Sequence, residues 1–332
     1  MEIGITTTIP VEVLFAAGHV PVDLNNVFIT HPDPPGLVQR AEEQGLPRNM
    51  CSWVKGIYSV IRENPRIKKV VAVTEGDCSN TLSMLDLLSP LGVEAITFSY
   101  PHSRSRDELD GSIGKLERHF GVTREDTSKW SKRLGRIREK ALALDTLTFR
   151  DGKISGFENH LCLVSLSDFN GDPDSFERDL DALLLQAEGR PAARYRYRLG
   201  YCGVPCIYRD LYPFLQSLGA GVVFNEMQRQ FALPGGGHDV VEQYLAYTYP
   251  YSYDHRLEDI RQQARARELH GIIHYVQSFC HHQIQDRRLR DSLPLPVLTL
   301  EGDRPGPVLE RARIRIESFL EMLDGSGGSN PA

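Results

Sequence analysis

Three cysteines each stand shortly after a predicted strand. They are Cys78 after strand 67–74, Cys202 after strand 194–201, and Cys280 after strand 271–277. In open α/β sheets ligands bind beyond the carboxyl ends of the strands, so thiols from distant parts of the chain can meet there. Cys51 directly precedes a predicted helix, 52–61, where free N–H groups and the helix dipole stabilise a thiolate.

Soft thiolate ligands favour iron–sulfur clusters, zinc or Cu(I). Zinc sites usually show paired short spacings, whereas this chain has one Cys-x3-Cys pair, Cys202 and Cys206, and otherwise isolated thiols. Dispersed thiols from two halves of a chain suit a cluster held in a cleft better than a zinc knuckle. The alternative is that these residues are small buried side chains in turns. For Cys162, which lies in a predicted helix, core packing is the favoured reading.

Acid–base candidates lie near the same strand ends. Glu75 and Glu301 fall at the ends of predicted strands, and so does Glu226. A buried glutamate there could donate a proton, or it could instead cap the next helix, which the macrodipole favours. His281 follows Cys280 and either lines the cleft and protonates a substrate or belongs to a surface pair with His282.

The elements that position these residues alternate between strand and helix in two parts of the chain. Both ends of the sequence show this alternation, and the stretch 106–186 is almost purely helical. Such alternation predicts an α/β protein with parallel sheets covered by helices. We expect two domains, an N-terminal α/β domain with a helical extension over 1–165 and a C-terminal α/β domain over 166–332.

Composition excludes several classes of protein. The 332 residues are 41% hydrophobic and 25% charged, which is typical of a globular chain. The net charge of −6 argues against general nucleic-acid binding, and the apolar runs are too short for a membrane helix. Six cysteines without an export signal indicate a reducing compartment, so we expect a cytoplasmic protein. No P-loop motif is present, so ATP is not bound in that way.

Several motifs resemble those of one superfamily. They are Pro21–Phe28, Asn49–Tyr58, Glu75–Cys78, His270–Cys280, Pro296–Asp303 and Arg315–Leu323. Together they are similar to the 2-hydroxyacyl-CoA dehydratase subunits, a superfamily that also includes benzoyl-CoA reductase subunits and double-cubane cluster proteins. The resemblance implies two flavodoxin-like domains with a helical segment between them. It also implies a [4Fe–4S] cluster in the cleft, with Cys51, Cys78 and Cys280 as its ligands.

Further expectations come from the same resemblance. It implies an iron–sulfur component of an ATP-coupled, low-potential reductase or dehydratase that acts by single-electron transfer on a 2-hydroxyacyl-CoA or a related small substrate. The electron would come from a separate ATP-hydrolysing iron–sulfur activator, which agrees with the missing P-loop. The chain would form a homodimer or a heterodimer with a paralogous subunit. Cys202 and Cys206 stay candidates for additional ligands.

Three alternatives remain open from the sequence. The chain could be a non-catalytic partner subunit or electron-transfer scaffold of a heterodimeric dehydratase. It could carry a double cubane, which would need all six cysteines, although Met227 stands where such relatives often have a cysteine. It could also be a zinc-binding α/β protein.

Overall fold

The computed structural model describes residues 1–237 and 239–326 and contains two four-stranded sheets, both entirely parallel. The first has the order β2-β1-β3-β4. Its strands are β1 Glu2–Ile5, β2 Val20–Asp23, β3 Lys69–Glu75 and β4 Glu94–Ser99. Val70, Val71, Ala72 and Val73 of β3 are fully buried, as expected for a central strand covered on both faces.

The second sheet has the order β6-β5-β7-β8. Its strands are β5 Tyr197–Gly203, β6 Ala220–Asn225, β7 Gly271–Gln277 and β8 Val297–Gly302. Both sheets therefore have the same strand order. The second strand lies on one side of the first strand, and the third and fourth strands follow on its other side. This 2-1-3-4 order is the flavodoxin-like arrangement. The predicted α/β class with two flavodoxin-like domains is confirmed.

Helices of the first lobe connect and cover its strands. They are α1 Val11–Ala16, α2 Leu24–Thr30, α3 Pro34–Glu43, α4 Ser52–Glu63 and α5 Ser79–Leu85, with a short 3-10 turn, η1 Ser89–Leu91. Helix α4 buries a wide face that includes Val54, Ile57 and Val60. It packs against α2 and α3, and this packing fixes the position of the residue at its N-terminus, Cys51.

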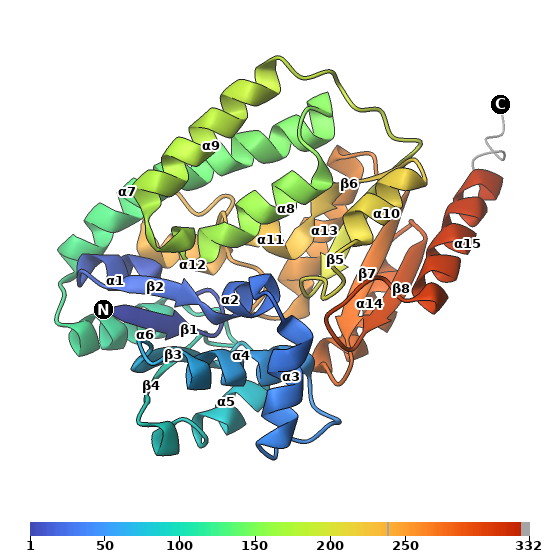
Figure 1. The fold of residues 1–332 in the computed structure, drawn as a ribbon. Coiled ribbons are helices and arrows are strands. Elements are labelled where there is room, and N and C mark those ends of the chain that lie inside the picture. The colour runs from blue at the N-terminus through green and yellow to red at the C-terminus, as the bar shows by residue number, and fades with distance from the viewer. Residues whose placement is uncertain (238, 327–332) are drawn as a thin grey trace.

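A helical segment follows the first sheet, as predicted. It comprises α6 Arg106–Phe120, α7 Arg124–Thr146, a π-helical turn η2 Leu147–Asp151, α8 Gly156–Val164, the turns η3 Ser165–Ser167 and η4 Phe169–Gly171, and α9 Pro173–Glu188. In Figure 1, α7 and α9 run above the two sheets. Thr123 and Asp126 form a capping box that begins α7.

The second lobe is completed by shorter helices. They are α10 Leu211–Ser217, α11 Glu226–Gln230, α12 Val240–Ala246, α13 Tyr253–Ala266, the turn η5 His281–Gln285, α14 Asp286–Ser292 and α15 Glu310–Ser326. Helix α12 packs on α6 and α7 although it is far from them in the sequence. The predicted C-terminal tail, 325–332, lies outside the described residues from 327 onward.

Apolar side chains of both lobes share one core. Phe28 and Ile57 of the first lobe belong to the same buried cluster as Tyr201, Ile273 and Tyr275 of the second. A second cluster joins the first sheet to the helical segment and to α12. In Figure 1 the blue first sheet and the yellow-to-orange second sheet accordingly lie beside each other. No helix in the described ranges is long and apolar enough to cross a membrane.

The sequence prediction differs from the structure in two respects. The stretch 20–29 is expected from the sequence to be extended or irregular; its first part is the extended strand β2, but the rest forms helix α2, which begins where the Asp23 side chain accepts the N–H of Asn25. Three predicted strands also end one or two residues too early. They are β3, which ends at Glu75, β5, which ends at Gly203, and β8, which ends at Gly302.

Candidate functional site

A cavity of about 550 Å³ lies where the carboxyl ends of both sheets come together. Thr6 and Thr7 border it just after β1, and Asp77 and Cys78 border it just after β3. From the second lobe, the residues that follow β5, β6 and β7 complete the wall. The cavity thus occupies the position at which open parallel sheets bind their ligands, and it does so for two sheets at once.

Cys51 lines the cavity as the N-terminal cap residue of α4. Burial raises the pKa of its thiol to about 12, whereas the backbone N–H groups of Val54 and Trp53 oppose that rise. The local sequence explains the position, because α4 begins directly after the cysteine and leaves its first N–H groups without helical partners. The thiol is therefore held protonated by burial, beside donors suited to a thiolate.

Cys78 caps α5 in the same manner. Its sulfur accepts the backbone N–H of Asn80 at 3.3 Å. Burial raises the pKa of this thiol too, and the neighbouring Asp77 adds to the rise. Burial also raises the pKa of Asp77, to about 6, while hydrogen bonds from the Cys78 N–H and the Thr81 hydroxyl lower it.

Cys280 precedes η5 and faces the same cavity from the second lobe. Burial raises the pKa of its thiol to about 11, against the effect of the His282 N–H group. His281 and His282 also line the cavity, and their rings lie 4.0 Å apart between centroids. Burial lowers the pKa of both imidazoles, so both are neutral at pH 7.

These three thiols are electrostatic neighbours. Ionisation of Cys280 or Cys78 would raise the pKa of the Cys51 thiol, and ionisation of Cys78 would raise that of Cys280. Within 1–237 and 239–326, no three or more His, Cys, Asp or Glu side chains are arranged to hold a single metal ion. The thiols therefore border one cavity without converging on one point.

This arrangement fits a cubane better than a zinc ion. Structural zinc needs four ligands around one centre, and no such set is present among the described residues. A [4Fe–4S] cubane takes one thiolate for each iron, and its irons occupy separate corners. Three thiols around one cavity, one buried and two partly buried, each beside backbone N–H donors, are a suitable donor set for such a cluster.

The other three thiols are placed differently. Cys206 lines the cavity, but its sulfur accepts the N–H of Tyr208 at 3.4 Å and lies beside Tyr201. Cys202 is fully buried in an apolar cluster and is not among the lining residues. Cys162 packs against the cluster that joins the first sheet to the helical segment, also away from the cavity lining. The six thiols therefore do not all border one site.

The glutamates selected from the sequence also lie in different surroundings. Glu75 is exposed and accepts the backbone N–H of His102 at 3.2 Å. Glu301 is exposed and accepts the hydroxyl of Ser278 at 2.6 Å. Neither is among the residues that line the cavity, whereas His281 is.

A buried ion pair lies behind the thiol end of the cavity. The Arg256 guanidinium donates twice to Glu226, with both N···O distances at 2.7 Å, and both side chains are almost fully buried. Arg256 also lies 5.0 Å from the centre of the Tyr249 ring, which lines the cavity. Both charges are satisfied within the protein, so neither is free to bind a substrate.

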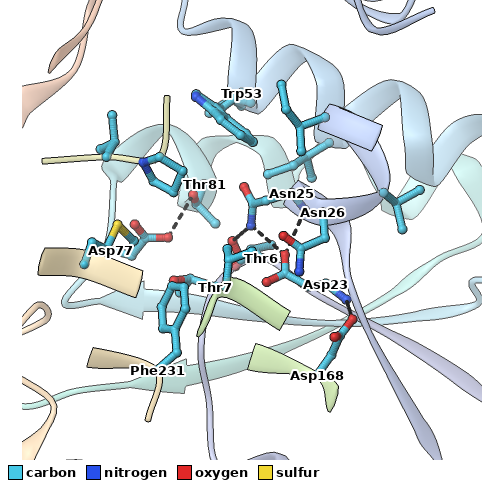
Figure 2. Close-up of a pocket in the computed structure, with 18 of the residues that line it drawn as sticks. Thr6, Thr7, Asp23, Asn25, Asn26, Trp53, Asp77, Thr81, Asp168 and Phe231 are labelled. Carbon is cyan, nitrogen blue, oxygen red and sulfur yellow. Dashed lines mark hydrogen bonds between the residues drawn. The ribbon is translucent and has the colours of Figure 1, made fainter. Parts of the chain in front are cut away.

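Two carboxyl groups that sequence reasoning missed lie at the other end of the cavity. Asp168 accepts the backbone N–H of Asp23 at 2.7 Å, and both side chains are at least 94% buried and line the cavity. Burial raises the pKa of both carboxyls, that of Asp168 to about 7, with the Asp23 charge as a second cause. Figure 2 shows Asp77 and Asp168 on opposite sides of the view, with Thr6, Asn25 and Asn26 between them.

Most of the remaining wall is apolar. Trp53 lies over the cavity in Figure 2, and Phe231 borders it on the opposite side. Further apolar lining residues come from both lobes and from α8. They include Val20, Val22, Val27, Ile29, Ile57, Leu161, Val164, Val204 and Met227. A molecule in this cavity would meet thiols and the Asp77 carboxyl at one end, the Asp23 and Asp168 carboxyls at the other, and a mostly apolar wall.

The fold and this site define a two-lobed α/β protein with a thiol-lined cavity between its sheets. A family model described as 2-hydroxyglutaryl-CoA dehydratase, D-component, matches residues 6–323. The chain therefore belongs to the 2-hydroxyglutaryl-CoA dehydratase D-component family, and the resemblance inferred from its motifs is confirmed. A comparison with curated proteins finds no match.

Proposed function

We propose that this chain is the iron–sulfur component of a 2-hydroxyacyl-CoA dehydratase or a related low-potential reductase. Membership of the dehydratase D-component family supports the reaction class. The observation that carries the proposal is that Cys51, Cys78 and Cys280, from both lobes, border one cavity and influence one another's ionisation. These three thiols would hold a [4Fe–4S] cluster as thiolates.

The protein's own groups prepare the cavity for such a cluster. Backbone N–H groups at the starts of α4, α5 and η5 would stabilise the thiolates once their protons are displaced. Apolar walls keep water away and favour a low local dielectric, one of the properties that set a cluster's potential. When bound, the cluster would supply single-electron chemistry at an iron that lacks a protein thiolate.

Proton handling falls to residues of this same wall. Of the acid–base candidates from the sequence, which are Glu75, Glu226, Glu301 and His281, only His281 lines the cavity. Its imidazole stands one residue from Cys280, so we assign it the role of moving a proton to or from a bound substrate. Glu75 and Glu301 would then act outside the chemical step, as exposed hydrogen-bond acceptors at the ends of β3 and β8.

Electrons would have to come from another protein. The sequence carries no P-loop, so the proposal includes a separate ATP-hydrolysing activator with its own iron–sulfur cluster. A "D-component" is one part of a multi-component system, which agrees with this division of labour. A single cubane is proposed rather than a double one, because Cys162 and Cys202 are not among the lining residues.

Anaerobic metal analysis tests the proposal directly. The full chain, purified or reconstituted without oxygen, should contain about four irons and four sulfides. Cys51→Ser, Cys78→Ser and Cys280→Ser should each lose most of this iron. Cys202→Ser and Cys162→Ser are matched controls, because these thiols lie outside the cavity, and both should keep it.

Two results would contradict the assignment. Zinc without acid-labile sulfide would identify a different metal site. Equal iron content in Cys280→Ser and Cys202→Ser would show that the cavity thiols are not the ligands. A chain that holds its cluster but shows no turnover with its activator would instead be the electron-transfer or partner subunit of a heterodimer.

A further inference from the structure

The cavity wall contains no cationic side chain that could bind an anion. Among its lining residues in the described part of the chain, none is lysine or arginine. Four of them carry carboxyl groups: Glu2, Asp23, Asp77 and Asp168. A second carboxylate on a substrate's acyl chain, such as that of a glutaryl group, would therefore meet like charges and no counter-charge.

The nearest cations are already bound by other residues. Arg256 lies behind the Tyr249 ring and is paired with Glu226 through two hydrogen bonds. Lys55 lies on α4 near Cys51, but its ammonium group is 2.8 Å from Glu42 and it is 1% exposed. Turning Arg256 toward the cavity would leave the buried Glu226 carboxylate unpaired, which is costly. Turning Lys55 toward the cavity would take its ammonium group out of the cluster that it forms with Glu42 and Arg304.

Histidines do not supply the missing charge at the carboxyl end. His160 lines the cavity there with Leu161 and Val164, and burial alone lowers its pKa to about 4. Its ring stacks on Phe157, and its Nδ1 lies 2.9 Å from the amide nitrogen of Gln228. His281 and His282 lie at the thiol end, next to Cys280.

The Asp23–Asp168 pair forms the far end of the space that a bound acyl chain would enter. Asp23 is held by hydrogen bonds from Asn25, and Asp168 by the N–H groups of Asp23 and Asn170. These partners orient the carboxyl groups without adding positive charge. The apolar residues of the cavity wall, among them Val27 and Ile57, favour a hydrocarbon chain.

We infer that the cavity accepts acyl groups without charge, aliphatic or aromatic, and that the Asp23–Asp168 pair excludes acyl groups with a second carboxylate. On this inference, which rests on the proposed function, the substrate class of this chain differs from the 2-hydroxyglutaryl group in the family description. The two aspartates are specificity-determining residues that act by repulsion when they are ionised, so the discrimination should be strongest above about pH 7, where Asp168 loses its proton.

Binding of two matched thioesters to the full-length, anaerobically purified protein tests this inference. The probes are the N-acetylcysteamine thioesters of 2-hydroxyisocaproate and of 2-hydroxyglutarate, which have a similar size and differ at the chain end, an isopropyl group against an anionic carboxymethyl group. Without the CoA phosphates, the difference reports the acyl end alone. Isothermal titration at about pH 8, where Asp168 is ionised, should show at least about tenfold tighter binding of the isocaproyl thioester.

Variants locate the source of the discrimination. Asp168→Asn removes the charge, keeps one of the two acceptor oxygens and should bring the two affinities to within about threefold. Asp181→Asn removes the same charge from the exposed face of α9 and should leave the ratio unchanged. Should Asp168→Asn fold poorly, Leu161→Lys offers a second route, because Leu161 lines the cavity but is 45% exposed. This added cation should strengthen binding of the glutaryl thioester.

A second pair of probes separates this inference from the proposed function. Isocaproamide and glutaramate carry nearly the same chain-end difference without a thioester. Tighter binding of isocaproamide, with no binding of either thioester, would support the charge selection while removing the thioester substrate from the proposed function. Equal or tighter binding of the glutaryl probes, or no binding of any of the four, would overturn the inference.

Discussion

The two ends of the cavity solve the problem of buried charge in opposite ways. At the thiol end, Arg256 and Glu226 neutralise each other a short distance behind the wall, and helix N-termini supply N–H donors. At the carboxyl end, Asp23 and Asp168 have no cation and depend on amide donors and on a retained proton. The N–H donors at the thiol end therefore stabilise negative charge, whereas the Asp23–Asp168 pair at the carboxyl end disfavours the binding of a further anion.

The largest expected effect comes from removing one partner of the buried Arg256–Glu226 ion pair behind the thiol end. Arg256→Met would leave Glu226 buried without its partner, which should lower the free energy of unfolding by about 3–5 kcal/mol. Urea denaturation measures this loss. The double variant Arg256→Met/Glu226→Leu should recover much of it. A loss below about 1 kcal/mol in the single variant would mean that the pair does not neutralise this end.

An intermediate effect is expected from pH at the carboxyl end. The Asp168 carboxyl has a pKa of about 7 in the folded chain, against 3.8 as the ordinary value. Between these values the folded state holds a proton that the unfolded state has released, so this group's contribution to stability falls as the pH rises from about 4 to 7. The Asp168 carboxyl accepts the N–H groups of Asp23 and Asn170, and the Asp23 carboxyl beside it is hydrogen-bonded by Asn25 and Ser167.

The measurement is the difference in unfolding free energy between the wild type and Asp168→Asn across that pH range. The asparagine cannot titrate. The unfolding free energy of the wild type should therefore fall by about 1–4 kcal/mol relative to that of the variant between pH 4 and pH 7. Asp181→Asn, on the exposed face of α9, should show no such trend. A pH-independent difference for Asp168→Asn would show that the pair holds no proton.

The smallest effect on stability is expected at Phe279. This residue borders the thiol end, is 54% exposed and has a backbone φ of +65°, which is unfavourable for any residue but glycine. Phe279→Gly should therefore change the free energy of unfolding by less than about 1 kcal/mol, because relief of strain offsets the added chain entropy. Its affinity for the isocaproyl thioester should nevertheless fall, and a fall in stability without a fall in affinity would contradict this.

Sequence reasoning located the thiol end because a simple rule applies to it. Residues that follow parallel strands gather at one edge of a sheet, and Cys78 and Cys280 do follow β3 and β7. The same rule fails for Cys202, because β5 continues to Gly203. Cys202 therefore lies within the strand, where it pairs with His274 inside the sheet. Glu75 and Glu301 likewise belong to strands that run one or two residues beyond the predicted ends.

The carboxyl end was beyond such reasoning. Asp23 and Asp168 are 145 residues apart and meet only because η4 packs beside β2. Asp23 lies in the Pro21–Phe28 motif and Asp168 in none of the family-like motifs, and no sequence pattern links the two residues. The stretch around Asp23 is predicted to be extended or irregular, whereas the structure has a strand followed by a helix that Asp23 caps. Contacts of this kind depend on tertiary packing, which local patterns do not encode.

The shared apolar core of the two lobes has a consequence for how molecules reach the cavity. Parting the sheets would expose Phe28, Tyr201 and Tyr275 to water, at a hydrophobic cost that grows with each side chain uncovered. Molecules must therefore enter and leave the cavity through an opening between side chains while the two sheets keep their positions. Phe279 and Leu161, both bordering the cavity and about half exposed, are the residues whose rotation would open it.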